Sequence, residues 1–163
     1  MTALTLAPDD VLSWTEVVIR LLAATGIGGA IGLNRELTRK PAGLRTHALV
    51  ALGSALATVS AIQLGGPAGA SHGDPTSRVI QGIVAGIGFI GGGAILKGDE
   101  NVRGTATAAS IWNVGVIGAA VGFGMYSIAI ILALANIALL RVMVPIKREI
   151  YRKGSAQRNA DEN

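Results

Sequence analysis

The sequence contains no cysteine, and its 163 residues include only two each of tryptophan, tyrosine and phenylalanine. Without cysteine, disulfide frameworks, thiol nucleophiles and cysteine-ligated zinc or iron–sulfur sites are excluded. A soluble core of this size draws much of its bulk from aromatic side chains, so their scarcity disfavours a soluble enzyme. The chain is rich instead in glycine, with 23 residues, and half of its residues are hydrophobic, giving a mean hydropathy of +0.52.

Charge is also missing from long stretches of the chain. Thr46–Leu64 and Val79–Leu96 contain 19 and 18 uncharged residues, and a further 37 separate Arg103 from Arg141. As one helix the last stretch would run about 55 Å, against a hydrocarbon core of about 30 Å, so it must turn back, and Gly122–Gly124 is the expected turn. The pattern predicts an all-α polytopic membrane protein, a bundle of five glycine-rich transmembrane helices at residues 12–33, 46–64, 79–96, 105–121 and 125–144.

The first of these spans differs from the others because it contains two charged residues, Glu16 and Arg20. They are four positions apart with the acid first, the favourable order for a helical ion pair, and Trp14 beside them is typical of an interface anchor. We therefore expect an ion pair near the membrane surface. The alternative is that Arg20 is a functional charge facing the protein interior. At the other end of the chain, Pro145 is expected to stop the last helix, and residues 154–163 to form a short disordered end.

Lysine and arginine gather on alternate connections, and such a bias sets the orientation of a membrane protein. Basic residues follow the first, third and fifth spans, whereas residues 1–11 contain acids and no base. The count predicts an extracytoplasmic N-terminus (1–11), a membrane domain (12–144) and a basic cytoplasmic tail (145–163). Residues 1–11 lack the basic region of a signal peptide, so the first span is expected to be retained. The tail has one aromatic residue, Tyr151, and no stacking array, so nucleic acid is not expected as a partner.

Glycines recur at a spacing of four residues. In lipid, small residues four apart allow two helix backbones to approach closely, and such packing replaces the hydrophobic effect as the means of association. The third span contains six glycines, and we expect it to be the central helix of the bundle. Its run Gly91–Gly93 is expected to serve packing, with local unwinding that exposes carbonyl oxygens to an ion as the alternative. The four pairs are Gly28 with Gly32, Gly82 with Gly86, Gly88 with Gly92, and Gly118 with Gly122.

Two segments on the expected cytoplasmic side mix charges of both signs. Acids set among arginines favour ion pairs that fix the two loops to one another. The alternative is a site at which Glu36 and Asp99 coordinate a hard cation such as Mg²⁺ through oxygen, with water retained. The adjacent arginines favour an anion or a partner's carboxylate instead. The candidate cytoplasmic cluster comprises Arg35, Glu36, Arg45, His47, Asp99 and Arg103, and the extracytoplasmic candidates are Asp74 and Arg78.

Few other polar residues fall within the predicted spans. His47, at the start of the second span, is expected to be a hydrogen-bonded structural residue, with a pH sensor as the alternative. Gln81 and Asn113 lie within spans, as does Arg20, and are expected to find partners across helices. No nucleophile with a paired base appears, since His72 lies beside polar residues in a glycine-rich loop and makes no triad. The sequence thus gives no catalytic constellation and no cofactor site.

Several longer motifs occur in a fixed order: GGAIGLNRE at 28–36, KPAGLRTH at 40–47, GIGFIGGG at 86–93, VRG at 102–104 and TAASIW at 107–112. With these motifs the sequence resembles the MgtC/SapB family of bacterial inner-membrane proteins, over roughly Leu12–Val144. One departure is Asn34, which stands where the family commonly shows an acid. Longer members carry a cytoplasmic ACT-like domain after the last span, whereas this sequence ends 19 residues after Val144, so the resemblance implies a short form without it.

The resemblance implies a role in adaptation to low magnesium, and in the survival of pathogens inside host cells, through modulation of membrane partners such as the ATP synthase. Our leading hypothesis is a non-enzymatic, multi-pass protein of the bacterial plasma membrane that regulates a partner complex or ion homeostasis. A small Mg²⁺ transporter or channel subunit is the alternative, and a membrane-embedded enzyme ranks third. Besides the lipid bilayer, the expected partners are a membrane protein and a second copy of the chain.

Overall fold

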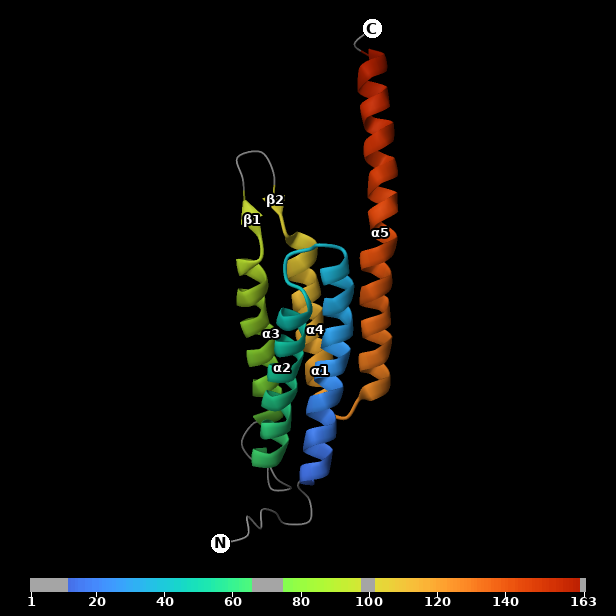
Figure 1. Ribbon diagram of the computed structural model, residues 1–163. Helices are drawn as coiled ribbons and strands as arrows, with labels where there is room; N and C mark the ends of the chain where they lie inside the picture. Colours follow the sequence, from blue (N-terminus) through green and yellow to red (C-terminus); the bar gives the residue numbers. More distant parts are fainter. Residues whose placement is uncertain (1–11, 66–74, 98–101, 162–163) are drawn as a thin grey trace.

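The computed structural model describes residues 12–65, 75–97 and 102–161, so the predictions for residues 1–11, Asp74 and Asp99 lie outside the described residues. Within these ranges the chain forms five helices and one short hairpin (Figure 1). The hairpin pairs Leu96 with Arg103 and Lys97 with Val102 in antiparallel register. The elements are α1 (Trp14–Leu37), α2 (Leu44–Gly65), α3 (Pro75–Gly93), β1 (Leu96–Lys97), β2 (Val102–Arg103), α4 (Thr105–Gly122) and α5 (Tyr126–Asp161).

Helix α1 begins at a complete capping box. The Ser13 side chain accepts a hydrogen bond from the Glu16 backbone N–H at 3.3 Å, and the Glu16 carboxylate accepts from the Ser13 backbone N–H at 3.0 Å. The box satisfies two N–H groups that have no partner within the helix. Because it engages Glu16, the ion pair expected between Glu16 and Arg20 does not form, and that prediction was wrong.

The turn between α4 and α5 lies where the glycines predicted it. The Gly124 N–H donates to the Val121 carbonyl at 2.8 Å and the Met125 N–H to the Ala120 carbonyl at 2.9 Å, the two bonds of a Schellman motif. Gly124 has φ +78°, a left-handed conformation that costs a residue with a Cβ about 1–2 kcal/mol. The predicted span 105–121 therefore matches α4 to within one residue.

Helix α5 contradicts the predicted stop at Pro145 and the predicted disordered end, since it continues to Asp161 over 36 residues. Proline removes one backbone N–H and crowds the carbonyl four residues earlier, a cost of about 3 kcal/mol, but the remaining ladder can continue on both sides. Lysine, arginine and glutamate, all good helix formers, follow Pro145 closely. At 1.5 Å per residue the helix is about 54 Å long, and its second half extends beyond the bundle (Figure 1).

Helix α3 is displaced relative to the predicted span 79–96. It begins at Pro75, because proline suits the first helical position, and it ends at Gly93. There the Ala94 and Ile95 N–H groups donate to the Gly91 and Gly92 carbonyls at 3.0 and 3.1 Å, which closes the helix in a tight turn. Those two carbonyl oxygens are thus used by the backbone, so the glycine run ends a helix and does not unwind within one.

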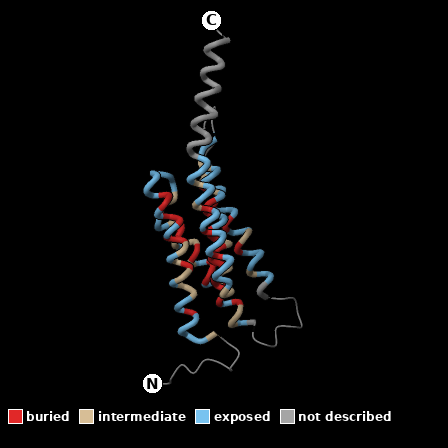
Figure 2. The backbone as a smooth tube through the Cα atoms, turned by 90° about the vertical axis from the view of Figure 1, so that its right-hand side faces the viewer, coloured by how far each residue is buried: buried red, intermediate tan, exposed pale blue. Residues whose placement is uncertain are grey.

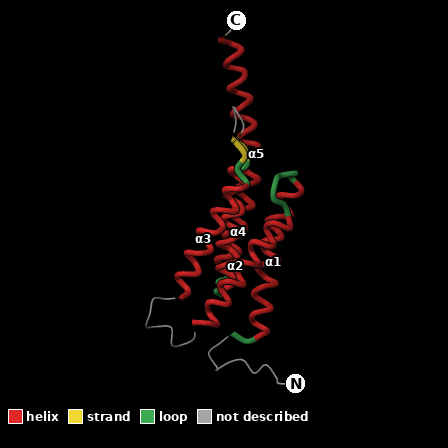
Figure 3. Tube along the Cα trace, turned by 90° about the vertical axis from the view of Figure 1, so that its left-hand side faces the viewer, coloured by secondary structure: helices red, strands yellow, loops and turns green. Residues whose placement is uncertain are grey.

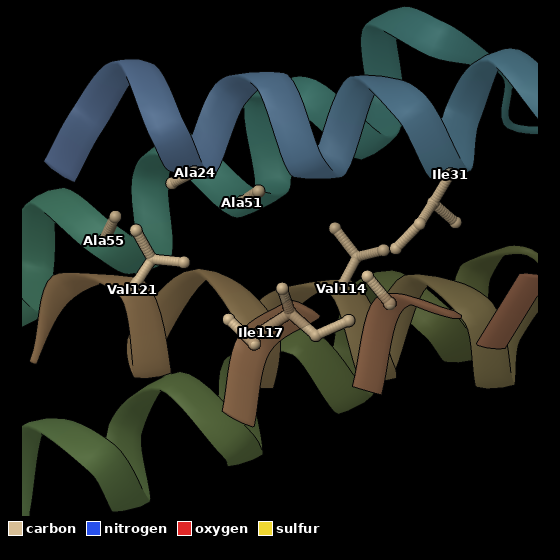
Figure 4. Close-up of a cluster of buried hydrophobic side chains, with 9 residues drawn as sticks. Ala24, Ile31, Ala51, Ala55, Val114, Ile117 and Val121 are labelled. Atoms are coloured by element: carbon tan, nitrogen blue, oxygen red, sulfur yellow. The ribbon is translucent and has the colours of Figure 1, made fainter. Parts of the chain in front are cut away.

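The core lies between α1, α2 and α4. Small and branched side chains from the three helices point into one shared space (Figure 4). Exposed residues follow the outer lengths of the helices, with buried residues gathered between them (Figure 2). The labelled core residues are Ala24 and Ile31 of α1, Ala51 and Ala55 of α2, and Val114, Ile117 and Val121 of α4.

Two of the four glycine pairs bring these helices together. A Cβ added at Gly28 would lie 2.6 Å from the Ala51 Cβ, and one at Gly32 would lie 2.7 Å from the Leu44 Cα, so both glycines seat α1 on α2. Gly118 and Gly122 seat α4 on α2, beside α1, since a Cβ at Gly118 would lie 2.8 Å from the Ala51 Cα. Helix α4 also contacts α1, α3 and α5 and is the most buried of the four long apolar helices, so it is the central helix of the bundle.

The prediction that the third span is central was wrong. A Cβ added at Gly82, Gly86, Gly88 or Gly92 would have no neighbour within 4 Å, and all four glycines are exposed. Helix α3 packs at the edge of the bundle through Ile83 and Ile87, which form a small cluster with Ile111 of α4. Spacing alone could not separate the inner from the outer pairs, because both repeat every four residues.

Four of the five helices, α1, α2, α4 and α5, are long and apolar enough to cross a membrane, judged over the described residues. Many large apolar side chains are exposed on them, as expected of surfaces that face lipid. The chain is an all-α, polytopic membrane protein. The α1–α2 connection, the hairpin and the far end of α5 lie at one end of the bundle (Figures 1 and 3), so the predicted cytoplasmic segments share one side.

Candidate functional site

A cavity of about 660 Å³ lies at that end of the bundle, between α1, α4 and α5. Its volume is within the range of small-molecule sites, about 300–1,000 Å³. Three of its lining residues are cations, and no acid lines it among the side chains that the structure describes. The lining comprises Asn34, Arg35, Thr38 and Lys40 from α1 and the turn after it, Ala106, Ala109, Ser110 and Asn113 from α4, and Asn136, Leu139, Leu140, Arg141 and Met143 from α5.

Arg35 is the most deeply placed of the three cations, with 4% of its surface exposed. Its Nη2 donates a hydrogen bond to the Thr107 hydroxyl of α4, while its Nε has no partner among the residues that the structure describes. No ion pair to Arg35 forms within the same residues. A buried charge without a counter-charge is costly, by several kcal/mol.

Asn34 and Arg141 join α1 to α5 beside the cavity. The Arg141 Nε donates to the Asn34 Oδ1 at 2.7 Å, and Asn34 is buried whereas Arg141 is exposed. Because the acceptor is a neutral amide, the bond fixes the arginine without neutralising it. Asn34 thus leaves the charge of Arg141 at the cavity.

Asn136, in the middle of α5, is a site residue that the sequence reading missed. It is 4% exposed, and its Nδ2 has no hydrogen-bond acceptor among the described residues. Asn136 could have been identified from the sequence, because a polar residue inside an apolar span should seek a hydrogen-bond partner on another helix. Asn113, singled out by that rule, also lines the cavity, from α4. Lys40 and Ser110 lie within the KPAGLRTH and TAASIW motifs but were not singled out as site residues, and they also line the cavity.

His47 lies behind the cavity and is fully buried. Its Nδ1 is 2.9 Å from the Gly43 carbonyl, which can only accept, so this nitrogen carries the proton. Its Nε2 is 3.0 Å from the Ser110 hydroxyl and, in the neutral ring, accepts from it. The imidazole therefore ties the start of α2 to α4, and its two contacts favour the structural interpretation over the pH sensor.

The remaining cytoplasmic candidates do not converge on the cavity. The Glu36 carboxylate accepts from the Leu44 backbone N–H at 2.9 Å and so caps the start of α2. Arg45 and Arg103 are exposed, and no ion pair to Glu36 forms within the described residues. Among those residues, no group of three or more histidine or acidic side chains could hold a metal ion. The cation site between Glu36 and Asp99 stays a prediction, since Asp99 lies outside them.

The polar residues predicted within the membrane have separate surroundings. The Arg20 Nη1 donates to the Gly122 carbonyl at 2.8 Å and so caps the end of α4. A cation at a helix C-terminus satisfies a free carbonyl and complements the helix dipole. Gln81 and Arg78 are exposed on α3, away from the cavity, and Gln81 therefore does not reach into the bundle.

Comparison with known proteins gives the chain its relatives. The MgtC family model matches residues 21–149. Protein SrpB of Synechococcus elongatus is 40% identical over 126 residues, which cover 72% of this chain and 69% of that protein. "Putative magnesium transporter YhiD" of Escherichia coli K12 is 41% identical over 140 residues, which cover 85% of this chain and 65% of that protein.

Protein MgtC of Salmonella typhimurium LT2 is 40% identical over 126 residues, which cover 75% of this chain and 52% of that protein. This chain thus spans between about half and about two thirds of the length of these relatives. No solved structure matches it. The family model covers most of the chain, including α4 and all of the cavity lining, and the resemblance seen in the motifs is confirmed: this membrane protein belongs to the MgtC family.

Proposed function

We propose that this chain is a non-enzymatic regulator in the bacterial plasma membrane, which acts in adaptation to low magnesium by binding a membrane partner such as the ATP synthase. Family membership and the name of the Escherichia coli relative support the link to magnesium. The observation that carries a regulatory role is the close packing of α1, α2 and α4 on one another. Glycines bring the backbones into contact there, and alanine, valine and isoleucine fill the remaining space.

The outer face of α3 is the surface on which we expect a protein partner to dock within the membrane. Gly82, Gly86, Gly88 and Gly92 are exposed on it without a neighbour, although such spacing suits close helix packing. Helix α3 also exposes Arg78 and Gln81, two polar side chains that lipid solvates poorly. A second helix docked along these glycines would cover the less apolar surface.

A Mg²⁺ transporter is the second candidate, favoured by the name given to the Escherichia coli relative. Hard cations require several oxygen ligands, usually carboxylates and water. The cavity between α1, α4 and α5 offers arginine and lysine instead, and repels Mg²⁺. A transport role would therefore have to use a path that avoids this cavity.

To test the partner, a deletion strain that carries the tagged chain is grown in low magnesium. The tagged chain is then purified in mild detergent, and the ATP synthase recovered with it is measured. Gly86→Leu places a large side chain on the outer face of α3. Gly26→Leu does the same on α1, where an added Cβ also has no neighbour, and serves as the matched control. We expect Gly86→Leu to reduce both growth in low magnesium and recovery of the ATP synthase at least fivefold, with Gly26→Leu unchanged.

Recovery of the synthase that is the same for wild type, both variants and an unrelated membrane protein would overturn the partner assignment. Growth that the wild-type chain fails to restore in low magnesium would overturn the link to magnesium. Both variants should reach wild-type abundance in the membrane, because a Cβ added at either position has no neighbour within 4 Å.

A further inference from the structure

The cavity between α1, α4 and α5 combines a positive charge with unused hydrogen-bond donors. Arg35, Lys40 and Arg141 line it, and no acidic side chain does so in the part of the chain whose side chains are described. The Arg35 Nε and the Asn136 Nδ2 are both buried and have no acceptor within the described part of the chain. Leaving a buried donor unsatisfied costs about 1–3 kcal/mol, and more for a charged group. Both residues line the cavity, so a ligand that supplies several anionic oxygens would bring acceptors to their side chains.

The wall of the cavity on the α5 side is apolar and faces outward. Leu139 and Met143 line it and are each more than half exposed on a helix that is apolar enough to face lipid. A small hydrophilic anion would leave this wall in contact with water, whereas the glycerol and first acyl carbons of a lipid would cover it. The cavity also lies at the end of the bundle that carries the basic connections, and such segments attract anionic lipid headgroups.

We propose that this cavity binds the headgroup phosphate of an anionic phospholipid. The guanidinium groups of Arg35 and Arg141 pair with the phosphate oxygens, since arginine presents N–H donors in the fork geometry that phosphate accepts. The Asn136 amide donates to the same phosphate from α5, and Lys40 contributes charge at the rim. The ligand joins α1, α4 and α5 in addition to the Asn34–Arg141 hydrogen bond.

This inference does not depend on the proposed function. The phosphate site lies between α1, α4 and α5, whereas the proposed partner docks on the outer face of α3. If the cavity binds no phosphate, the partner surface on α3 is unaffected, and the reverse also holds. The two proposals are tested with different variants.

The site is tested on the full purified chain in detergent by native mass spectrometry and thermal unfolding. The probes are phosphatidylglycerol, phosphatidylcholine and inorganic phosphate. We expect the wild-type chain to retain one phosphatidylglycerol and to unfold at a higher temperature with it. Arg141→Gln and Asn136→Leu should weaken this binding at least tenfold. Arg45→Gln and Arg103→Gln remove the same charge from exposed positions outside the cavity and should bind as the wild type does.

Equal loss in the cavity and control variants would mean general attraction to a basic surface and would overturn the proposal. Equal retention of phosphatidylcholine would also overturn it. A full thermal shift with inorganic phosphate and none with the lipid would assign the cavity to a free anion instead. Because Asn136 is buried, Met143→Trp provides a second variant: it fills the cavity from an exposed rim position, and should abolish retention while the chain stays folded.

Discussion

Replacing Gly118 with alanine should separate the two helices that hold the core together. The added Cβ would lie 2.8 Å from the Ala51 Cα and 2.9 Å from the Ala51 carbonyl carbon, where ordinary contact begins near 3.4 Å. Helix α4 would have to move away from α2 by about 0.6 Å or more, and overpacking of this kind costs about 1–3 kcal/mol. These neighbours are backbone atoms of a helix, so no side chain can rotate aside.

The matched control is Gly86→Ala, on the outer face of α3, where the added Cβ has no neighbour within 4 Å. Alanine gains helix propensity over glycine in both variants, by up to about 1 kcal/mol, and this gain cancels in the comparison. We therefore expect Gly118→Ala to be less stable than Gly86→Ala by about 1–3 kcal/mol. The measurement is the free energy of unfolding in mixed detergent micelles, followed by helical circular dichroism. Equal stability of the two variants would refute the close packing of α4 on α2.

Three further substitutions test individual contacts by the same unfolding assay. Arg20→Met removes the cap on the Gly122 carbonyl and should destabilise the chain by about 1.5–3 kcal/mol, the usual worth of a hydrogen bond to a charged group; no change would mean that water replaces it. His47→Leu keeps the volume but leaves the Ser110 hydroxyl without its acceptor, and a loss of about 1–3 kcal/mol is expected, whereas a gain would contradict a structural role. Gly104→Ala should cost at least about 1 kcal/mol, because Gly104 has φ +92° and an added Cβ would meet the Ala94 carbonyl; tolerance of alanine would contradict the hairpin geometry.

The spans were predictable because charge and hydropathy act locally. The gap between Arg103 and Arg141, with the glycines near its middle, located α4 and the turn after it. Which helix lies at the centre was not predictable, since it depends on what each glycine faces. Gly82 and Gly118 belong to identical four-residue repeats, yet one is exposed and the other touches Ala51.

The candidate site was predicted in part for a similar reason. Arg35 was identified from the density of charge around it, and its neighbours favoured an anion. Its contact with Thr107 lies 72 residues along the chain, however, and the bond from Arg20 to Gly122 spans 102. Pairings over such distances leave no local pattern. The ion pair predicted between Glu16 and Arg20 does not form. The Glu16 carboxylate instead accepts a hydrogen bond from Ser13, three residues earlier, in a capping box.

We propose that this chain acts in magnesium adaptation without carrying the ion. The direct test is Mg²⁺ flux into liposomes that contain the purified, folded chain and an entrapped Mg²⁺-sensitive dye. With α1, α2 and α4 closely packed and the cavity lined by cations, we expect flux no greater than that of protein-free liposomes. Flux well above that background, and reduced by Glu36→Gln or Asp99→Asn, would contradict the account and establish a transporter.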